Sequence, residues 1–158
     1  MPDILVDVYK SIPAEMGAVY RCLTDFREAQ PRLLPNSFRD YAVVSGGIGE
    51  GTIVTCTTTF RGRDRRFSFR ISEPIPTKAI TGYDHDSLLT VTWHLRPEGP
   101  TTEVEIEAYW TEPDQRFGFL VKWWAYFAVR PILEHMLKQI PLVIKDLDLD
   151  RPTTPAIP

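Results

Sequence analysis

The sequence predicts an α+β fold in which a curved antiparallel sheet of seven strands wraps around one long C-terminal helix. Three observations predict this architecture. One β-type segment near the N-terminus and six more between residues 38 and 111 supply the strands. The segments between them are rich in Gly, Pro and Asp, as hairpin loops are. Residues from about 114 to 148 carry a helical pattern of apolar side chains.

The N-terminal part predicts one strand followed by two short helices. Residues 3–11 place three β-branched side chains on one face of a strand. Pro13 suits the first turn of a helix, because the N–H group that it lacks has no partner there in any case. Pro31 and Pro35 bracket one further short turn and end the helical region.

The middle of the chain predicts six further strands. Val104, Ile106 and Ala108 take one face of the last strand, and glutamates take the other. This alternation predicts a sheet with one dry face and one wet face. The six strands are expected near residues 38–46, 51–61, 65–73, 78–84, 87–96 and 102–111.

Length and composition fit one domain over residues 1–150, followed by a proline-rich, disordered tail over residues 151–158. The net charge of −3 gives no general attraction to nucleic acid, so no nucleic-acid partner is expected. Cys22 and Cys56 fall in a helical and a strand pattern, which predicts two reduced, buried thiols. The N-terminus lacks a signal-peptide pattern and no apolar stretch is long enough to span a membrane, so we expect a cytoplasmic protein.

The long C-terminal helix changes phase along its length. Its second half carries one apolar stripe, which is expected to grip the sheet. In its first half Leu120, Trp124 and Phe127 lie opposite that stripe, whereas Lys122 and Tyr126 continue it.

Two alternatives follow from this change of phase. Pro131 removes a backbone hydrogen bond, and a helix re-phased there would turn the aromatic cluster inward. In a helix that stays in phase, the polar side chains point inward and the aromatic cluster stays outside. An outside cluster would mark a homodimer interface, a peripheral membrane contact or a ligand gate.

Several short motifs accompany this order of elements. They are Ile12-Pro13-Ala14-Glu15, Thr24-Asp25-Phe26, Leu34-Pro35 and Gly49-Glu50-Gly51-Thr52. Together with the element order, they resemble the START-related, Bet v-like superfamily, often called SRPBCC, and most of all its polyketide cyclase/dehydrase and lipid-transport branch. The resemblance covers nearly the whole chain and implies a helix-grip fold. No catalytic signature is shared across that branch, so the resemblance assigns no catalytic residue.

The resemblance and the strand alternation together imply a cavity between the sheet and the C-terminal helix, where ligands commonly bind. Its wall is mainly apolar and aromatic, which suits a lipid, a quinone or a polyketide-like molecule, and no cofactor or metal is expected. The alternative is that the same side chains fill a solid core. The residues expected to contact a ligand are Cys56, Thr58, Phe60, Phe67, Phe69, Thr81, Tyr83, Val91, Trp93, Ala108, Trp110, Phe119, Lys122, Trp123 and Tyr126.

Carriage of this apolar ligand is the first functional prediction, and two others stay open. A cofactor-independent cyclase or dehydrase would need acid–base groups in the same cavity. The candidates for that role are Tyr83, Lys122, Tyr126 and Arg130. A docking protein would instead use the aromatic face of the C-terminal helix against a partner, a membrane or a second copy of the chain.

Two charged clusters also carry alternatives. Asp84-His85-Asp86 has the groups of a metal or acid–base site, although Asp at a tight turn is common for backbone reasons. Five arginines surround one hairpin, where they either bind an anionic headgroup or form a solvated edge that deters strand pairing. These arginines are Arg61, Arg63, Arg65, Arg66 and Arg70.

Overall fold

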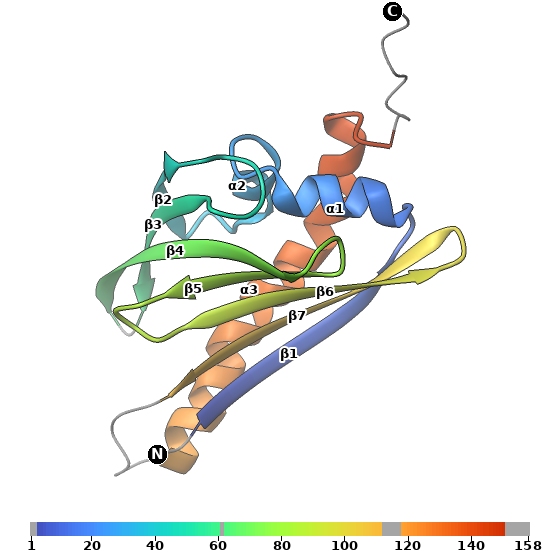
Figure 1. The fold of residues 1–158 in the computed structure, drawn as a ribbon. Coiled ribbons are helices and arrows are strands. Elements are labelled where there is room, and N and C mark those ends of the chain that lie inside the picture. Colours follow the sequence, from blue (N-terminus) through green and yellow to red (C-terminus); the bar gives the residue numbers. More distant parts are fainter. Residues whose placement is uncertain (1–2, 61, 112–117, 151–158) are drawn as a thin grey trace, which may run out of the picture.

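The computed structural model describes residues 3–60, 62–111 and 118–150, and within them the expected α+β architecture is confirmed. Two short helices follow the first strand, and a long helix follows the last strand (Figure 1). In chain order the elements are β1 (Asp3–Ile12), α1 (Met16–Thr24), α2 (Ala29–Leu33), β2 (Phe38–Ser45), β3 (Ile53–Phe60), β4 (Arg63–Ile75), β5 (Ala79–Asp84), β6 (Thr90–Glu98), β7 (Thr101–Thr111) and α3 (Gly118–Asp146). The expected start of the long helix near 114 and the expected tail over 151–158 lie outside the described residues.

The sheet is antiparallel, with the strand order β1-β7-β6-β5-β4-β3-β2. Strands β2 to β7 pair with their neighbours in the chain, and β1 adds to the far edge, with Val6 opposite Ala108. The register shifts in β2, and again in β4 between Ser72 and Ile75. Irregularities of this kind bend a strand, which agrees with the curvature of the sheet in Figure 1.

The core is built where β1 and β7 meet the helices. Val104 and Ile106 of β7 are fully buried, and Ile4 and Val6 of β1 are nearly so. α3 packs mainly against β1, α1 and α2. The helix therefore covers one edge of the sheet closely, while β3, β4 and β5 curve away on the other side (Figure 1).

The buried stripe of α3 keeps its phase through Pro131. The helix is continuous across this proline. Leu133, Met136 and Ile140 are buried after it, and Val129 is partly buried one turn before Leu133. Spacings of three and four residues place all of these side chains on one face of a single helix.

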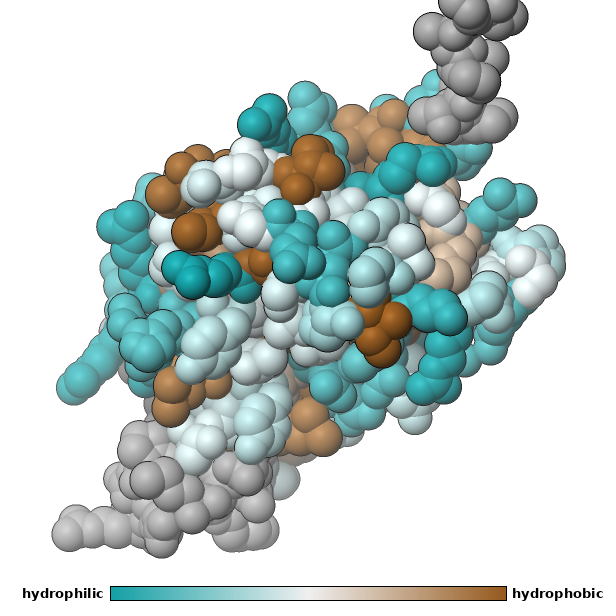
Figure 2. Space-filling view, in the orientation of Figure 1, coloured by the Kyte–Doolittle hydropathy of each residue, from teal (hydrophilic) through white to brown (hydrophobic). Residues whose placement is uncertain are grey.

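The aromatic side chains that the structure describes in the first half of α3 lie outside. Phe127 is 58% exposed, so the alternative in which the helix re-phases and buries this residue is wrong. The side chains of Leu120 and Trp124, expected beside it, lie outside the described residues. Figure 2 shows that hydrophobic residues on the opposite, sheet side of the molecule are scattered among hydrophilic ones.

α1 and α2 cover one end of the sheet and are tied down on two sides. The guanidinium of Arg21 on α1 donates to the carbonyl of Leu149, just beyond α3, with a distance of 3.2 Å from Nε. The N–H of Phe26 donates to the carbonyl of Gly47 at 2.9 Å, which fixes the chain after α1. Gly47 has a φ of 140°, a conformation that favours glycine.

Replacement of Ile140 by alanine tests the buried stripe of α3. Ile140 is fully buried, so Ile140→Ala removes apolar contacts and leaves a cavity. We expect the free energy of unfolding to fall by about 2–5 kcal/mol. Leu142 lies on the same helix but is 55% exposed, so Leu142→Ala should change the free energy of unfolding by less than about 0.5 kcal/mol. Urea unfolding measures both values, and equal losses would contradict the assigned stripe.

Candidate ligand cavity

A cavity of about 390 Å³ lies between the sheet and α3. Its volume falls within the range of roughly 300–1,000 Å³ that is common for small-molecule sites. Phe67, Phe69 and Ile71 line it from β4. Val91 and Trp93 line it from β6, across the intervening strand β5. The alternation of β4 and β6 thus places aromatic and aliphatic side chains along one face of the sheet.

Gly82 of β5 leaves space in the middle of this wall. It lies opposite Ile71 on β4 and opposite Val91 on β6. A Cβ atom at Gly82 would lie 3.4 Å from Ile71 Cδ1 and 3.5 Å from Phe69 Cδ1, which is ordinary van der Waals contact. A longer side chain would have to extend past these two groups into the cavity.

Eight of the residues expected to contact a ligand lie on this wall. They are Cys56, Thr58, Phe67, Phe69, Val91, Trp93, Ala108 and Trp110. The expected residues Phe60, Phe119 and Lys122 have side chains outside the described part of the structure.

The expected inward orientation of Thr81 and Tyr83 is wrong. Both alternate with Ile80 and Gly82, which line the cavity, so they lie on the outer face of β5. Thr81 Oγ1 lies 3.2 Å from Thr92 Oγ1 on that face, and Tyr83 is 39% exposed. The sequence of β5 misled because one inward position is a glycine, which has no side chain to signal burial.

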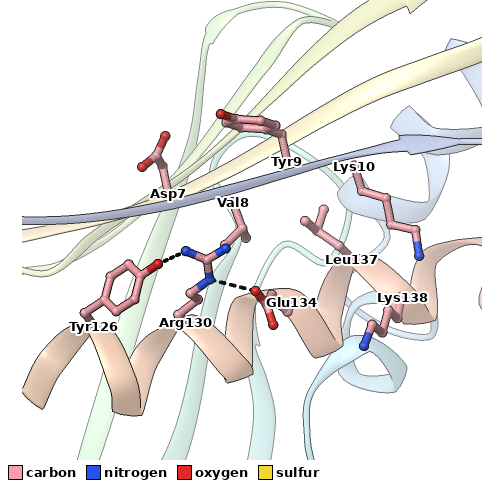
Figure 3. A pocket seen from close by; sticks show the side chains of 9 residues that line it. All are labelled: Asp7, Val8, Tyr9, Lys10, Tyr126, Arg130, Glu134, Leu137 and Lys138. Atoms are coloured by element: carbon pink, nitrogen blue, oxygen red, sulfur yellow. Dashed lines mark hydrogen bonds and ion pairs between the residues drawn. The ribbon is translucent and has the colours of Figure 1, made fainter.

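Tyr126 and Arg130 lie in a different, polar groove between α3 and β1, with a volume of about 420 Å³ (Figure 3). Arg130 Nε donates to Glu134 Oε1 at 2.7 Å, and the same guanidinium donates to the Tyr126 hydroxyl. Asp7 and Lys10 of β1 line the opposite side of the groove. The prediction that Tyr126 and Arg130 reach the apolar cavity is therefore wrong.

Trp123 is also absent from the cavity wall, contrary to expectation. It is 59% exposed, and its ring centroid lies 4.8 Å from that of Phe127 in an edge-on contact. Phe127 makes a second edge-on contact with Tyr126, at 5.7 Å. Three exposed aromatic rings thus gather on the first half of α3.

No described helix has both the length and the apolarity that crossing a membrane requires.

At the end of the cavity that α1 and α2 cover, the polar side chains of the wall donate hydrogen bonds to main-chain carbonyls. The Tyr41 hydroxyl donates to the carbonyl of Phe26 at 2.6 Å, and Gln30 Nε2 donates to the carbonyl of Leu23 at 2.7 Å. Burial raises the pKa of Tyr41, so its hydroxyl stays protonated at neutral pH. Both side chains hold the α1–α2 segment over the cavity rather than offering an acid or a base.

Cys56 is a buried thiol on the cavity wall. Burial raises its pKa to about 11, and the negative charge of Asp84 adds to the rise. The second thiol, Cys22 on α1, is fully buried, and burial raises its pKa to about 12. Both cysteines are free and buried, as expected. Since the thiolate is the nucleophilic form, Cys56 acts here as a small apolar wall residue.

Asp84 has the backbone role that is common for Asp at a tight turn. It is 2% exposed and accepts hydrogen bonds from the N–H groups of Ser68 and Ser87, each at 2.9 Å. Ser87 Oγ donates to the same carboxylate at 2.5 Å. Among the residues that the structure describes, no group of His, Cys, Asp and Glu is arranged to hold a metal ion.

Sequence reasoning missed the end of the cavity that α1 and α2 close. Phe26, Gln30 and Leu34 line it there, together with Phe38 and Tyr41 of β2. The paired prolines around this segment indicated a short helical turn. They gave no sign of which side chains it turns toward the sheet.

Comparison by sequence finds no match, since neither a protein-family model nor a curated protein matches the chain. Comparison of structures does find matches. The NMR structure of the protein KanY matches with a TM-score of 0.80 and 24% identity, over 92% of this chain and 99% of that chain. A START superfamily protein from Mycobacterium smegmatis matches with a TM-score of 0.69 and 17% identity, over 90% and 98%. The chain has the helix-grip fold of the START-related proteins.

The helix-grip fold is also found in an enzyme. A Thalictrum norcoclaurine synthase mutant, solved with a transition state analogue, matches with a TM-score of 0.67 and 16% identity, over 92% of this chain and 96% of that chain. Identities this low show a common fold alone. The function of this helix-grip protein must therefore be argued from its own cavity.

The rate at which iodoacetamide alkylates Cys56 in the native protein measures how much of its thiol is deprotonated. Its pKa of about 11 lies two units above the ordinary 9.0, so the thiolate fraction at pH 8 is about a hundredfold lower than normal. The thiol is neutral below its pKa, so we expect slow modification at pH 8 and a rate that rises about tenfold per pH unit toward pH 11. Peptide mass spectrometry distinguishes Cys56 from Cys22. A rate that levels off near pH 9 would contradict the raised pKa.

Proposed function

We propose that this protein binds an apolar small molecule in the cavity between the sheet and α3, as a carrier or binding protein. The observation that supports this proposal is the cavity itself, about 390 Å³ in volume and walled mainly by apolar and aromatic side chains. Transfer of apolar surface from water into such a site lowers the free energy of the system. A lipid, a quinone or a polyketide-like molecule has the matching chemistry.

The ionisable groups of the wall favour a carrier over a cyclase or dehydrase. Acid–base catalysis needs a group near the substrate whose pKa is close to the working pH. Tyr41 donates to a carbonyl, and the pKa of Cys56 is about 11. The candidates Tyr83 and Arg130 lie on other surfaces. Lys122, the last of the four acid–base candidates, has a side chain outside the described residues. Asp86 and Arg65 also line the cavity, at its exposed end.

Binding of N-phenyl-1-naphthylamine, an uncharged probe that fluoresces in apolar surroundings, tests the proposal. Gly82→Leu directs an apolar side chain into the cavity, and we expect it to weaken binding by about tenfold or more because it occupies ligand volume. Thr81→Leu makes a comparable change one residue earlier, on the outer face of β5, and should leave the affinity within about twofold.

Circular dichroism and thermal unfolding check that both variants keep the fold. Gly82→Ala adds a side chain that fits without displacement, so it serves if Gly82→Leu does not fold, with a smaller expected loss of affinity. Undiminished binding by a folded Gly82→Leu protein would place the probe elsewhere and refute the site. Native mass spectrometry of the protein purified from its own host then identifies the natural ligand by its mass.

The exposed rings of Trp123, Tyr126 and Phe127 favour self-association through α3 as a second candidate role. An apolar patch on a helix becomes covered when two copies pack face to face. Leu120 and Trp124 belong to the same half of α3 and were expected in this interface.

Sedimentation of the wild type and of a Trp123→Ser/Phe127→Ser variant tests this second role. We expect the wild type to dimerise and the variant, which loses two apolar rings, to be monomeric. Leu142→Ser, at an exposed site on the other half of α3, is the control and should dimerise like the wild type. A wild type that stays monomeric at concentrations of about 100 μM, where a weak homodimer is still populated, rules the interface out.

A further inference from the structure

Five polar residues of the described cavity wall gather at one end of it. That end holds the β3–β4 hairpin, the β5–β6 turn and the last residues of β7, which Figure 1 shows on the same side of the sheet. The pairing of Thr58 with Arg65 belongs to the hairpin. The polar residues that line the cavity from these segments are Thr58, Arg65, Asp86, Ser87 and Thr111.

The opposite end of the cavity is mainly apolar. Ile80 and Trp93 lie opposite each other on β5 and β6 and form its floor. Phe26 and Leu34 close it from the α1–α2 segment, and Met136 closes it from α3. The polar groups there, on Tyr41 and Gln30, are the ones that already donate to main-chain carbonyls.

Arg65 is the one cationic side chain on the described part of the cavity wall. It shares the inner face of β4 with Phe67 and Phe69, because alternate residues of a strand point the same way. Arg65 is exposed, so this end of the cavity is hydrated. Arg65 already takes part in an interaction within the protein. Its guanidinium carries a permanent charge and five N–H donors in a planar fork, so it can hold an anionic oxygen in addition to that interaction.

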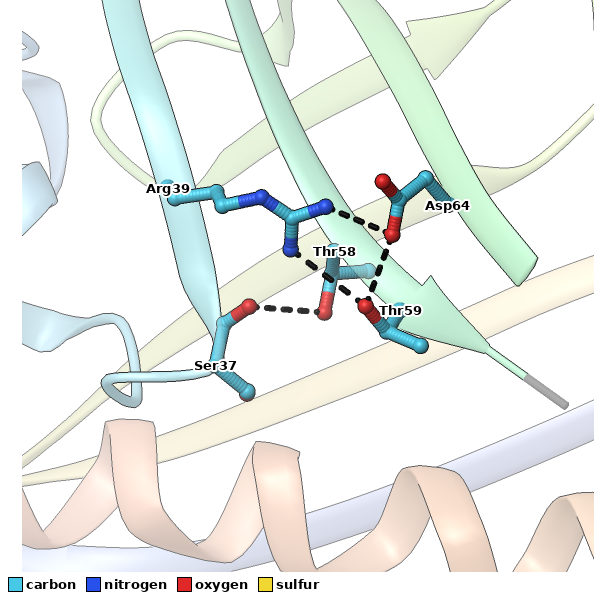
Figure 4. Close-up of polar contacts among 5 residues, drawn as sticks. All are labelled: Ser37, Arg39, Thr58, Thr59 and Asp64. Atoms are coloured by element: carbon cyan, nitrogen blue, oxygen red, sulfur yellow. Dashed lines mark hydrogen bonds and ion pairs between the residues drawn. The ribbon is translucent and has the colours of Figure 1, made fainter. Parts of the chain in front are cut away.

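Asp64, which precedes Arg65 in the sequence, interacts with residues on the other face of the sheet. Asp64 Oδ1 lies 2.6 Å from Arg39 and accepts a hydrogen bond from Thr59 at 2.9 Å (Figure 4). Arg39 lowers the pKa of this carboxyl, so Asp64 stays charged and paired there. Asp86 is the one acid on the described wall, and it adds acceptor oxygens to the polar end.

We propose that the ligand is amphipathic, with an apolar body in the end beneath α1 and α2 and one anionic group held against Arg65 at the other end. This inference rests on the proposed function and adds to it the orientation and the charge class of the ligand. A carboxylate, sulfonate or phosphate suits the fork of an arginine. Such a group also keeps part of its hydration at an exposed end, which lowers the cost of binding it.

Two probes that share one aromatic framework test the charge class. 8-Anilinonaphthalene-1-sulfonate carries a sulfonate, and N-phenyl-1-naphthylamine lacks it. We expect the wild type to bind the sulfonate probe about fivefold more tightly or better, since a charge-assisted hydrogen bond to Arg65 adds to the same apolar contacts. Each probe should displace the other, because both occupy one cavity.

Arg65→Gln and Arg66→Gln form a matched pair of variants. Both remove one positive charge from neighbouring positions of β4, but only Arg65 lies on the cavity wall. We expect Arg65→Gln to weaken binding of the sulfonate probe about tenfold and to leave the uncharged probe within about twofold. Arg66→Gln should change neither affinity by more than about twofold.

The outcomes separate this inference from the proposed function. Equal affinity of the wild type for the two probes, or equal weakening of sulfonate binding by both variants, overturns the role of Arg65 and leaves the cavity intact as an apolar site. Binding of the sulfonate probe without competition from the uncharged probe overturns it as well. Failure of the wild type to bind the uncharged probe overturns the proposed function itself.

Discussion

The packing of α3 against β1 is the contact on which the rest of the structure depends. β1 is an edge strand that pairs with β7 alone in the described sheet, and its buried face, with Ile4 and Val6, lies against α3. Arg21 fixes the far end of the same helix through the carbonyl of Leu149. A straight helix held at one edge of a curved sheet cannot follow the strands that bend away from it. The space that remains beside β3, β4 and β5 is the cavity.

The rotation of α3 about its axis decides which of its side chains meet that space. Val129, Leu133 and Met136 face the cavity, whereas Tyr126 and Arg130 turn toward β1. The difference between the two groups is less than half a turn of one helix. Between residues 126 and 136, the polar side chains Tyr126, Arg130 and Glu134 of α3 line the groove beside β1 and not the cavity. On the described cavity wall, the cationic side chain is that of Arg65 on β4.

The strands and the long helix could be predicted from periodicity, because each has one face in water and one in the core. β4 and β6 were oriented correctly for the same reason: Phe67, Phe69 and Trp93 stand alone among polar neighbours. The orientation of β5 could not be predicted. Its bulky residue Tyr83 lies outside, and an inward position is Gly82. Only the pairing register, which the neighbouring strands impose, decides which face is which.

The end of the cavity under α1 and α2 could not be predicted from the sequence for a related reason. Contacts such as Phe26 to Gly47, or Tyr41 to Phe26, join segments that the sequence separates by many residues. Local patterns report which face of an element is apolar, but they do not report which other element will cover that face. The phase of α3 was also left open by the sequence, because a proline inside a helix is compatible with both a kink and a continuous turn.

The polarity of the cavity follows from the way a helix-grip sheet is closed at its two ends. At one end α1 and α2 bring apolar side chains, since short helices packed on a sheet must bury one face. At the other end the strands finish in hairpins, where turn chemistry favours residues such as Asp86 and Ser87. Turn geometry does not require an arginine at position 65, on the inner face of β4 and beside the aromatic wall. Arg65 is therefore the cationic wall residue at this end that the proposed anionic group would contact.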